Sequence, residues 1–526
     1  MTTTTPPAKT TLRRRAIATG RRWWRQLTSM RTALILLLFL ALAAVPGSLL
    51  PQRNVNIEQV RAYYQDNPDL APIVDRLWGF DVYASPWFAA IYLLLFTSLV
   101  GCILPRLRDF IRTLRKPPPE PPARMSILPR YQETATGVDT DHAVRTLRKE
   151  RFRVSVRDRG DDVVISAEKG YLREAGNLLF HLSLIGLLIG VAYGSLYGWY
   201  GNRLLVAGED TAFCNSLQQY DEYGLGANVS PTDLAPFCLQ LDEFTATFLD
   251  NGQPTEFIAD VQYGQEGQAP HEPYRLRVNH PLELDGASVF LLGHGYAPVI
   301  SYTDRYGVTQ VSTTPFLVED SMLTSTGAAV FPDVNINPDT GQPDPDADIA
   351  FEGIFMPTVP DQPPFTTSVS PDTDNPGLLL IAYRGDTGLD DGEPQSVYSV
   401  SSERIADGSL EIIDVDPTVL SIGESWQLDD GTTVSFDGVL PYAILQVRED
   451  PGEIIVLTFA ITILLGIVPA LTVKRRRIWV RIGPDGTGLG GLTRNEYDGF
   501  DEEFDRLADT IAGRHQQPEQ IESPTP

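Results

Sequence analysis

Four apolar stretches restrict this chain to folds that cross a membrane. A transmembrane helix needs about 20 mostly apolar residues, and each stretch approaches or reaches that length. They lie at residues 33–50, 88–104, 177–196 and 454–473. The first stretch is not expected to be a cleaved signal peptide, because its small-residue triplet, Ala41-Leu-Ala43, lies inside a long apolar run.

Basic residues beside these stretches predict the orientation of the chain. Lys and Arg cluster before the first stretch, after the second and after the fourth, and such clusters stay on the cytoplasmic side. Four spans then place both termini in the cytoplasm, with residues 51–87 and 197–453 outside. We therefore expect a multi-pass protein of the cell (plasma) membrane.

The segments between the spans predict two folded domains of unequal size. Residues 197–453 contain short strand-like runs separated by Gly, Pro, Asn and Asp, which predicts a mostly antiparallel β domain. Residues 105–176 combine a Pro-rich linker with one helix at 141–150 and strands at 152–157 and 163–167. The expected fold class is an α+β membrane protein with four transmembrane helices, a large extracytoplasmic β domain and a small cytoplasmic α+β domain.

Three further segments complete the expected organisation. Residues 1–32 form a basic cytoplasmic arm, expected to be flexible. The outer loop at 51–87 has the spacing of one or two amphipathic helices broken near Pro68. Residues 474–526 form a cytoplasmic tail, in which an apolar stripe at 497–512 predicts a helix packed on the small domain.

The outer segment is strongly acidic. Residues 197–453 contain 42 Asp and Glu, seven Arg and no Lys, while the whole chain has a net charge of −26. This charge repels phosphates, so nucleic acid is not an expected partner. The aspartates of 337–348 resemble a loose calcium loop, but the glycine and distal glutamate of an EF-hand are missing. A solvated acidic loop is the favoured interpretation.

The three cysteines differ in their surroundings. Cys102 lies within the second apolar stretch, where a small buried side chain is expected. Cys214 and Cys238 lie in the outer segment, where an oxidising environment permits a disulfide. The sequence contains neither Cys-x-x-Cys nor Cys-x-x-Cys-His. We therefore expect no thioredoxin-like redox role and no covalently attached c-type haem on this chain.

His181 is the candidate functional residue, since it lies inside the third apolar stretch. An imidazole in hydrocarbon is costly and marks a functional site by default. Haem iron, in a flat apolar macrocycle, is a ligand suited to this position. Asn177 and Glu174 fall near the same helical face and are candidates to orient the ring. The alternative is an interhelical hydrogen bond, worth about 0.6–2 kcal/mol.

Two outer histidines are interpreted differently. His280 precedes a proline, and His294 stands between Gly293 and Gly295. Each alone is expected to be a surface or strand-end histidine.

Several short stretches resemble the ResB (CcsB) family of system II cytochrome c maturation. One of them is Gly176-Asn-Leu-Leu-Phe-His-Leu-Ser183, which contains the candidate histidine. The others are at residues 29–33, 45–52, 81–88, 101–106 and 279–282, the last followed by Gly293. The order of elements, with three spans, a large outer domain and a last span, is also similar.

The resemblance implies a function in haem delivery. The chain would work with a CcsA/ResC-type membrane subunit to move b-type haem outward and present it to apocytochrome c. His181 matches the family histidine implicated in haem handling, and further ligands would come from the partner. The chain would then be a non-catalytic or co-catalytic subunit of a holocytochrome c synthase, with no catalytic residue or other metal of its own. The alternative is a membrane-anchored extracytoplasmic sensor or assembly scaffold without haem.

Overall fold

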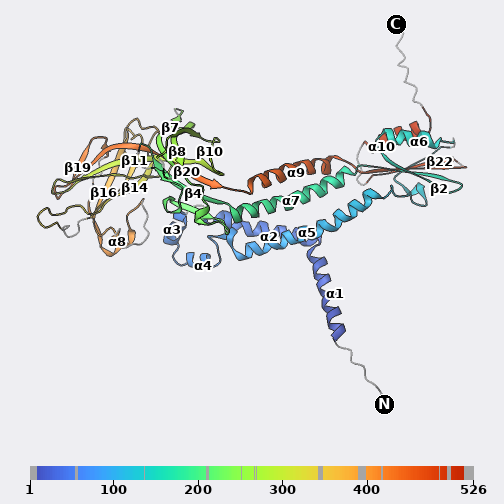
Figure 1. The fold of residues 1–526 in the computed structure, drawn as a ribbon, viewed down its shortest axis with the longest axis horizontal. Coiled ribbons are helices and arrows are strands. Elements are labelled where there is room, and N and C mark those ends of the chain that lie inside the picture. The colour runs from blue at the N-terminus through green and yellow to red at the C-terminus, as the bar shows by residue number, and fades with distance from the viewer. Residues whose placement is uncertain are drawn as a thin grey trace, which may run out of the picture. The chain divides into compact units, whose positions relative to one another are not determined.

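The computed structural model divides into two compact units, one of Met1–Val191 with Glu453–Pro526 and one of Ala192–Gly452. Figure 1 shows the fold and labels its elements. The structure describes residues 9–53, 57–134, 137–208, 212–249, 251–265, 267, 269–341, 348–388, 398–415, 419–484, 486–493 and 499–514.

Four described helices are long and apolar enough to cross a membrane. They are α2 (Met30–Leu49), α5 (Pro86–Arg115), α7 (Leu172–Tyr197) and α9 (Glu453–Thr472). They confirm the four predicted stretches. The starts of α2 and α5 are fixed by serine caps, because Ser29 and Ser85 each accept a hydrogen bond from a main-chain N–H of the first turn.

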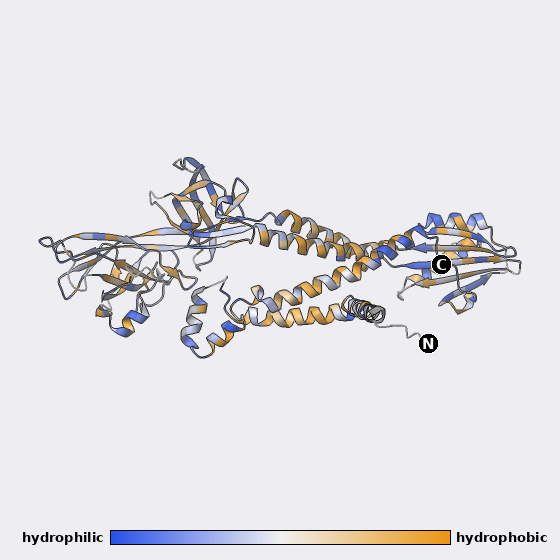
Figure 2. Cartoon of the chain, turned by 60° about the horizontal axis from the view of Figure 1, so that its bottom comes forward, coloured by the Kyte–Doolittle hydropathy of each residue, from blue (hydrophilic) through white to orange (hydrophobic). Residues whose placement is uncertain are grey.

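The helices pack in pairs, α2 with α5 and α7 with α9, and their side chains are mostly apolar (Figure 2). Glycines of α7 make its contact with α9. A Cβ on Gly186 would lie 2.4 Å from the Phe459 ring, and one on Gly176 would lie 2.5 Å from the Gly466 carbonyl oxygen. Small residues let helix backbones approach closely in a membrane, where apolar burial alone gives little driving force.

The basic arm is helical in its described part, a feature that the sequence did not predict. Helix α1 covers Lys9–Leu27. Its Arg, Leu and Ala residues are strong helix formers, and only Gly20 disfavours the helix. The outer loop contains helices α3 (Ile57–Asp66) and α4 (Ala71–Arg76), as its spacing predicts.

A five-stranded antiparallel sheet forms the small domain of the first unit. Its order is β1 (Arg130–Thr134), β22 (Gly486–Thr493), β21 (Arg476–Gly483), β3 (Val163–Lys169) and β2 (Arg153–Asp158). Helices α6 (Thr140–Lys149) and α10 (Phe500–Ile511) contribute to its core. The predicted apolar stripe of the tail helix is confirmed, although Tyr497 lies outside the described residues.

The tail contributes two strands to this sheet that the sequence did not predict. Strand β22 is rich in glycine, which is rare in strands. Here glycine leaves room for neighbouring side chains, since a Cβ on Gly491 would lie 2.6 Å from the Phe504 ring. The packing of the sheet, rather than strand propensity, therefore determines this element.

A buried ionic cluster joins the sheet to the ends of two membrane helices. Glu168 of β3 is 1% exposed and accepts hydrogen bonds from Arg475 at 2.6 Å and Arg477 at 2.8 Å. Burial would raise the pKa of Glu168, but hydrogen bonds from Tyr171, Arg475 and Arg477 outweigh it and lower the pKa. Arg475 also pairs with Glu174 at the start of α7. The cluster thus links β3 with α7 and with the segment that follows α9.

Three antiparallel sheets build the second unit, as expected for a mostly β domain. The central sheet contains β10 (Leu282–Leu284), β11 (Ala287–Thr303), β20 (Thr433–Glu449), β4 (Trp199–Val206) and β6 (Glu222–Leu225), with β12 (Thr309–Thr313) and β19 (Ser425–Gln427) beside them. A second sheet contains β5 (Phe213–Cys214), β7 (Phe237–Phe248), β8 (Pro254–Gln265) and β9 (Glu272–Arg277). The third contains β13 (Leu317–Val318), β14 (Ser325–Phe331), β15 (Ile349–Met356), β16 (Gly377–Gly385), β17 (Leu410–Val415) and β18 (Leu420–Ser421).

The central sheet shares one apolar core with the second sheet and another with the third. Two of its strands continue the membrane helices. Strand β4 follows α7 almost directly and β20 ends just before α9, and these strands pair with Trp199 opposite Glu449. The Trp199 indole donates a hydrogen bond to the Glu449 carboxylate at 3.0 Å. The pairing therefore joins the segment that follows α7 to the segment that precedes α9.

Replacing Glu168 by alanine should loosen the five-stranded sheet, because Arg475 and Arg477 would lose a buried partner. Breaking a buried ion pair costs about 3–5 kcal/mol. Hydrogen-exchange mass spectrometry should show faster amide exchange in β3 and β21. Glu120→Gln is the matched control, since Glu120 pairs with Arg157 and Arg159 at a more exposed site. Equal exchange in the two variants would contradict this role of Glu168.

Candidate functional site

His181 lies in the first half of α7, and one hydrogen bond among the described residues fixes its ring. Its Nδ1 atom is 2.7 Å from the main-chain carbonyl oxygen of Asn177, four residues earlier. A carbonyl oxygen only accepts, so Nδ1 must carry the proton and donate it. In the neutral ring, the lone pair then lies on Nε2. This is the nitrogen that a metal would bind.

The ring also packs against Phe180, with centroids 5.0 Å apart in an edge-to-face arrangement. His181 is partly buried.

His181 lies on the side of α7 opposite its contact with α9. Successive residues of an α-helix are about 100° apart, so His181 is about 140° around the axis from Gly176 and from Gly186. It is about 180° from Gly190, another glycine of the α9 contact. The imidazole therefore does not serve the pairing of α7 with α9.

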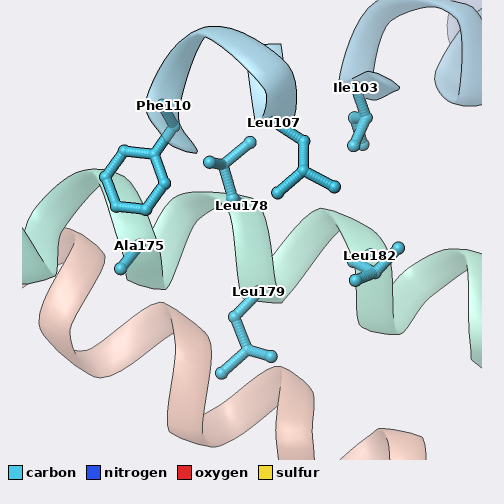
Figure 3. A pocket seen from close by; sticks show the side chains of 7 residues that line it. All are labelled: Ile103, Leu107, Phe110, Ala175, Leu178, Leu179 and Leu182. Atoms are coloured by element: carbon cyan, nitrogen blue, oxygen red, sulfur yellow. The ribbon is translucent and has the colours of Figure 1, made fainter. Parts of the chain in front are cut away.

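An apolar pocket of about 190 Å³ lies between α5 and α7 (Figure 3). His181 is not among its lining residues, although its sequence neighbour Leu182 is. Helix α7 contributes Ala175, Leu178, Leu179 and Leu182 to its lining, and α5 contributes Ile103, Leu107 and Phe110. The pocket is smaller than typical ligand sites, which hold about 300–1,000 Å³. It has room for an apolar edge of a ligand but not for a whole macrocycle.

The donor set fits haem better than a bare metal ion. No group of three or more His, Cys, Asp or Glu that could hold a metal occurs among the residues the structure describes. A porphyrin supplies four nitrogen ligands itself and needs only axial ligands from protein. One imidazole with a free Nε2 and an apolar neighbourhood is compatible with that requirement.

The two proposed orienting residues differ in their contacts. Asn177 contacts the imidazole through its main-chain carbonyl, and within the described part of the chain its amide side chain has no hydrogen bond. Any residue at this position would present the same carbonyl. Glu174 pairs with Arg475 in the ionic cluster described above. An orienting role for either side chain stays a prediction.

Cys214 and Cys238 are joined by a disulfide between the paired strands β5 and β7. The remaining cysteine, Cys102, is free and lies in α5, where its thiol donates to the Thr28 carbonyl at 2.6 Å. The second unit thus holds its two cysteines in a disulfide. Of the expected acidic loop, Asp344 and Asp346 lie outside the described residues.

His280 and His294 prove different from each other. His280 is exposed and forms an isolated bridge with Arg277, as expected for a strand-end residue. His294 instead lies within β11 and packs against the rings of Phe244 and Phe257 at centroid distances of 5.2 and 4.6 Å. Burial lowers its pKa to about 4. The expectation of a surface or strand-end histidine is wrong here, because the flanking glycines belong to a long strand and not to a turn.

Comparison with known proteins gives one consistent family. A family model described as ResB-like family matches residues 30–505. The chain is 23% identical over 494 residues to a protein of Synechococcus sp. (strain RCC307), named cytochrome c biogenesis protein CcsB, with 91% of this chain and 94% of that protein covered. A protein of the same name from Prochlorococcus marinus (strain AS9601) is 23% identical over 500 residues, covering 92% of this chain and 97% of the relative.

Acid should destabilise the second unit more in the unchanged chain than in a His294→Phe variant. The folded pKa of about 4 is below the ordinary value of about 6.5, so the unfolded chain takes up the proton first. Stability therefore falls as the pH drops from about 6.5 towards 4, and at pH 5 the loss from this group is about 2 kcal/mol. Thermal unfolding of the full chain at pH 7 and pH 5 measures the difference.

His271→Phe is the matched control, since His271 is exposed. It should keep the acid sensitivity of the unchanged chain. If His294→Phe kept that sensitivity as well, burial of a neutral imidazole at position 294 would be contradicted.

Proposed function

This chain belongs to the ResB-like family, and we propose that it acts in cytochrome c biogenesis as a membrane subunit that helps deliver haem to the outer face. The relatives described above are named cytochrome c biogenesis proteins, and they match this chain over about nine-tenths of its length. His181 is the proposed haem ligand. The observation that carries the proposal is the Nδ1 hydrogen bond to Asn177, because it leaves Nε2 free inside an apolar segment.

The residues around His181 have separate roles in this proposal. The Asn177 carbonyl fixes the ring and its tautomer, so that Nε2 points away from the main chain of α7. Leu178 and Leu182 offer apolar contact to the edge of the macrocycle beside the imidazole. The side of α7 that carries His181 faces away from α9, so the pairing of the two helices does not cover it. Haem supplies the vinyl groups that are joined to the cysteine thiols of apocytochrome c.

A second subunit is part of the proposal. His181 is the one histidine of the four apolar stretches, so a second axial ligand has to come from another chain. A CcsA/ResC-type membrane subunit, as the family resemblance implies, would supply that ligand and present haem at the outer face. Holocytochrome c synthesis would then be a property of the complex.

The proposed topology keeps both termini in the cytoplasm and the acidic β unit outside. In that position the β unit holds unfolded apocytochrome c. The thiols of the apocytochrome must be reduced when haem arrives, and the outer unit has its own cysteines in a disulfide. A separate thiol-reducing pathway is therefore part of the proposal.

Replacing His181 by glycine should remove haem from the complex purified with its CcsA/ResC-type partner, because the iron loses an axial ligand. Loss of a metal ligand should lower haem content at least about tenfold. Added imidazole should restore the haem absorption band, since it can occupy the space left by the side chain. His142→Gly is the control, because His142 lies in the cytoplasmic domain. Unchanged haem in His181→Gly would contradict the proposal and favour a scaffold without haem.

Replacing Asn177 by leucine should leave haem binding within about twofold of the unchanged chain. The imidazole is held by the main-chain carbonyl of this residue, and leucine keeps the helix and that carbonyl. The same haem spectrum measures the outcome. A loss comparable to that of His181→Gly would show that the amide side chain orients the ligand.

A further inference from the structure

Helix α1 carries a high density of positive charge. Its sequence, Lys9–Leu27, contains one Lys and six Arg and no Asp or Glu. Arg21, Arg22 and Arg25 are exposed, and none of them forms an ion pair with the described part of the chain. A surface with charge of one sign attracts partners of the opposite sign. This part of α1 can therefore bind anions that lie outside the chain.

The apolar side chains of α1 lie beside these arginines on the helix surface. Successive residues are about 100° apart around the axis, so Ile17, Trp24 and Leu27 fall within an arc of about 80°, which Trp23 extends to about 120°. The three arginines occupy the neighbouring arc of about 100°. Ile17 is 47% exposed, Trp24 54% and Trp23 70%. The helix thus has an apolar side that the described part of the chain leaves largely uncovered.

The turn after α1 is fixed to α5. Ser29 has an extended backbone and caps α2, so α1 and α2 are separate helices. The Ser98 hydroxyl of α5 donates a hydrogen bond to the Leu27 carbonyl at 2.6 Å, and the bond from Cys102 to the Thr28 carbonyl lies beside it. Figure 1 shows α1 running across the direction of α2 and α5 rather than along it. A helix with this direction lies along the surface of a membrane that α2 and α5 cross.

The apolar side of α1 adjoins the membrane-spanning surface of α5. Trp24 contacts α5, since a Cβ on Gly101 would lie 3.5 Å from its ring. Gly101 belongs to the apolar stretch of that span. Tryptophan is enriched at the boundary between hydrocarbon and headgroups, because its ring is apolar and its N–H is polar. The contact with Gly101 is consistent with Trp24 at this boundary.

These features favour a lipid surface over other anionic partners. A free phosphate or a nucleic acid would pair with the arginines but would leave both tryptophans exposed to water. One leaflet of anionic lipid offers phosphates to the basic side and hydrocarbon to the apolar side. A basic helix with Trp and Leu on its other side is typical of helices that lie in the membrane interface.

We propose that α1 is an interfacial helix that binds anionic phospholipid in the leaflet where α2 begins. Ile17, Trp23 and Trp24 insert between the headgroups, and the three arginines pair with lipid phosphates. Because its end is hydrogen-bonded to α5, the bound helix holds the start of α2 and the neighbouring part of α5 at a fixed depth. The proposal depends neither on haem nor on the side of the membrane at which the second unit lies.

Spin labels on two variants of the full chain test the orientation of α1. Gly20→Cys places the label on the apolar side, and Ala18→Cys places it among the arginines, about 160° away. Both positions are exposed. Cys102→Ser removes the free thiol from both variants and keeps a donor for the Thr28 carbonyl. In nanodiscs with phosphatidylglycerol, the ratio of oxygen accessibility to accessibility for a water-soluble nickel complex should be at least about threefold higher at position 20 than at position 18.

Two outcomes of this measurement would overturn the proposal. Equal ratios at the two positions would show that α1 does not lie in the interface. A label at position 20 that is shielded from oxygen and nickel alike would show that a protein partner, and not lipid, covers the apolar side.

Nitroxide-labelled lipids test the role of charge. A bimane fluorophore on Gly20→Cys, again with Cys102→Ser, reports the lipids next to α1. Nitroxide-labelled phosphatidylglycerol should quench it at least about twofold more than phosphatidylcholine with the same label and mole fraction, because arginines near the surface attract anionic lipid. Arg21→Gln/Arg22→Gln/Arg25→Gln should abolish this preference.

Arg145→Gln/Arg148→Gln/Lys149→Gln is the matched control, since it removes the same charge from exposed positions in α6. It should keep the preference for phosphatidylglycerol. Equal quenching by the two lipids in the chain with all arginines of α1 would overturn the proposal, and so would a preference that survives the replacement of the three arginines. Neither experiment measures haem, so failure here and failure of the proposed function can be told apart.

Discussion

Hydrocarbon offers no water to an imidazole, so both ring nitrogens of a membrane histidine need partners from protein or ligand. His181 satisfies one nitrogen within its own helix, through the Asn177 carbonyl. That bond needs no second helix, and the ring lies away from the glycine contact with α9. An interhelical hydrogen bond within this helix pair therefore does not account for the residue. The proposed delivery of haem depends on the nitrogen that remains.

The chain holds α7 and α9 together at both ends by different interactions. Beside the start of α7 and the end of α9, Glu168 accepts hydrogen bonds from Arg475 and Arg477 in a buried ionic cluster. At the other end, the strands that continue the two helices pair at Trp199 and Glu449. Between these ends, glycines bring the helix backbones together. A helix restrained in this way presents His181 in one defined orientation, which suits a ligand that must meet a second ligand from another chain.

The sequence predicts best those features that depend on local pattern. The four spans follow from the length of each apolar run, and the tail helix follows from the spacing of Phe500, Phe504 and Leu507. Features that depend on neighbouring elements escape such reasoning. Strand β22 forms because its glycines accept Phe504 and other large side chains. Gly293 and Gly295 suggest a turn, but both lie inside one long strand, β11. A β-bulge at Leu292, an extra residue in the pairing of β11 with β20, borders Gly293.

The candidate site also combines features that follow from local sequence with features that depend on neighbouring elements. The position of His181 in an apolar run is visible in the sequence, but its tautomer depends on the main-chain carbonyl that its ring reaches. Any residue at position 177 supplies that carbonyl, so the identity of Asn177 does not reveal the tautomer of His181. His294 was missed because its burial depends on three phenylalanines from β7 and β8. Only the bulge at Leu292 brings them together with the imidazole.

The central claim is a bond between iron and Nε2 of His181. Electron spin-echo spectroscopy of ferric haem in the purified complex detects that bond directly when only this chain carries isotopically labelled histidine. The account predicts a coupling from labelled nitrogen that disappears in a His181→Met chain. Haem that shows no coupling to labelled nitrogen, or the same coupling after the replacement, would contradict it.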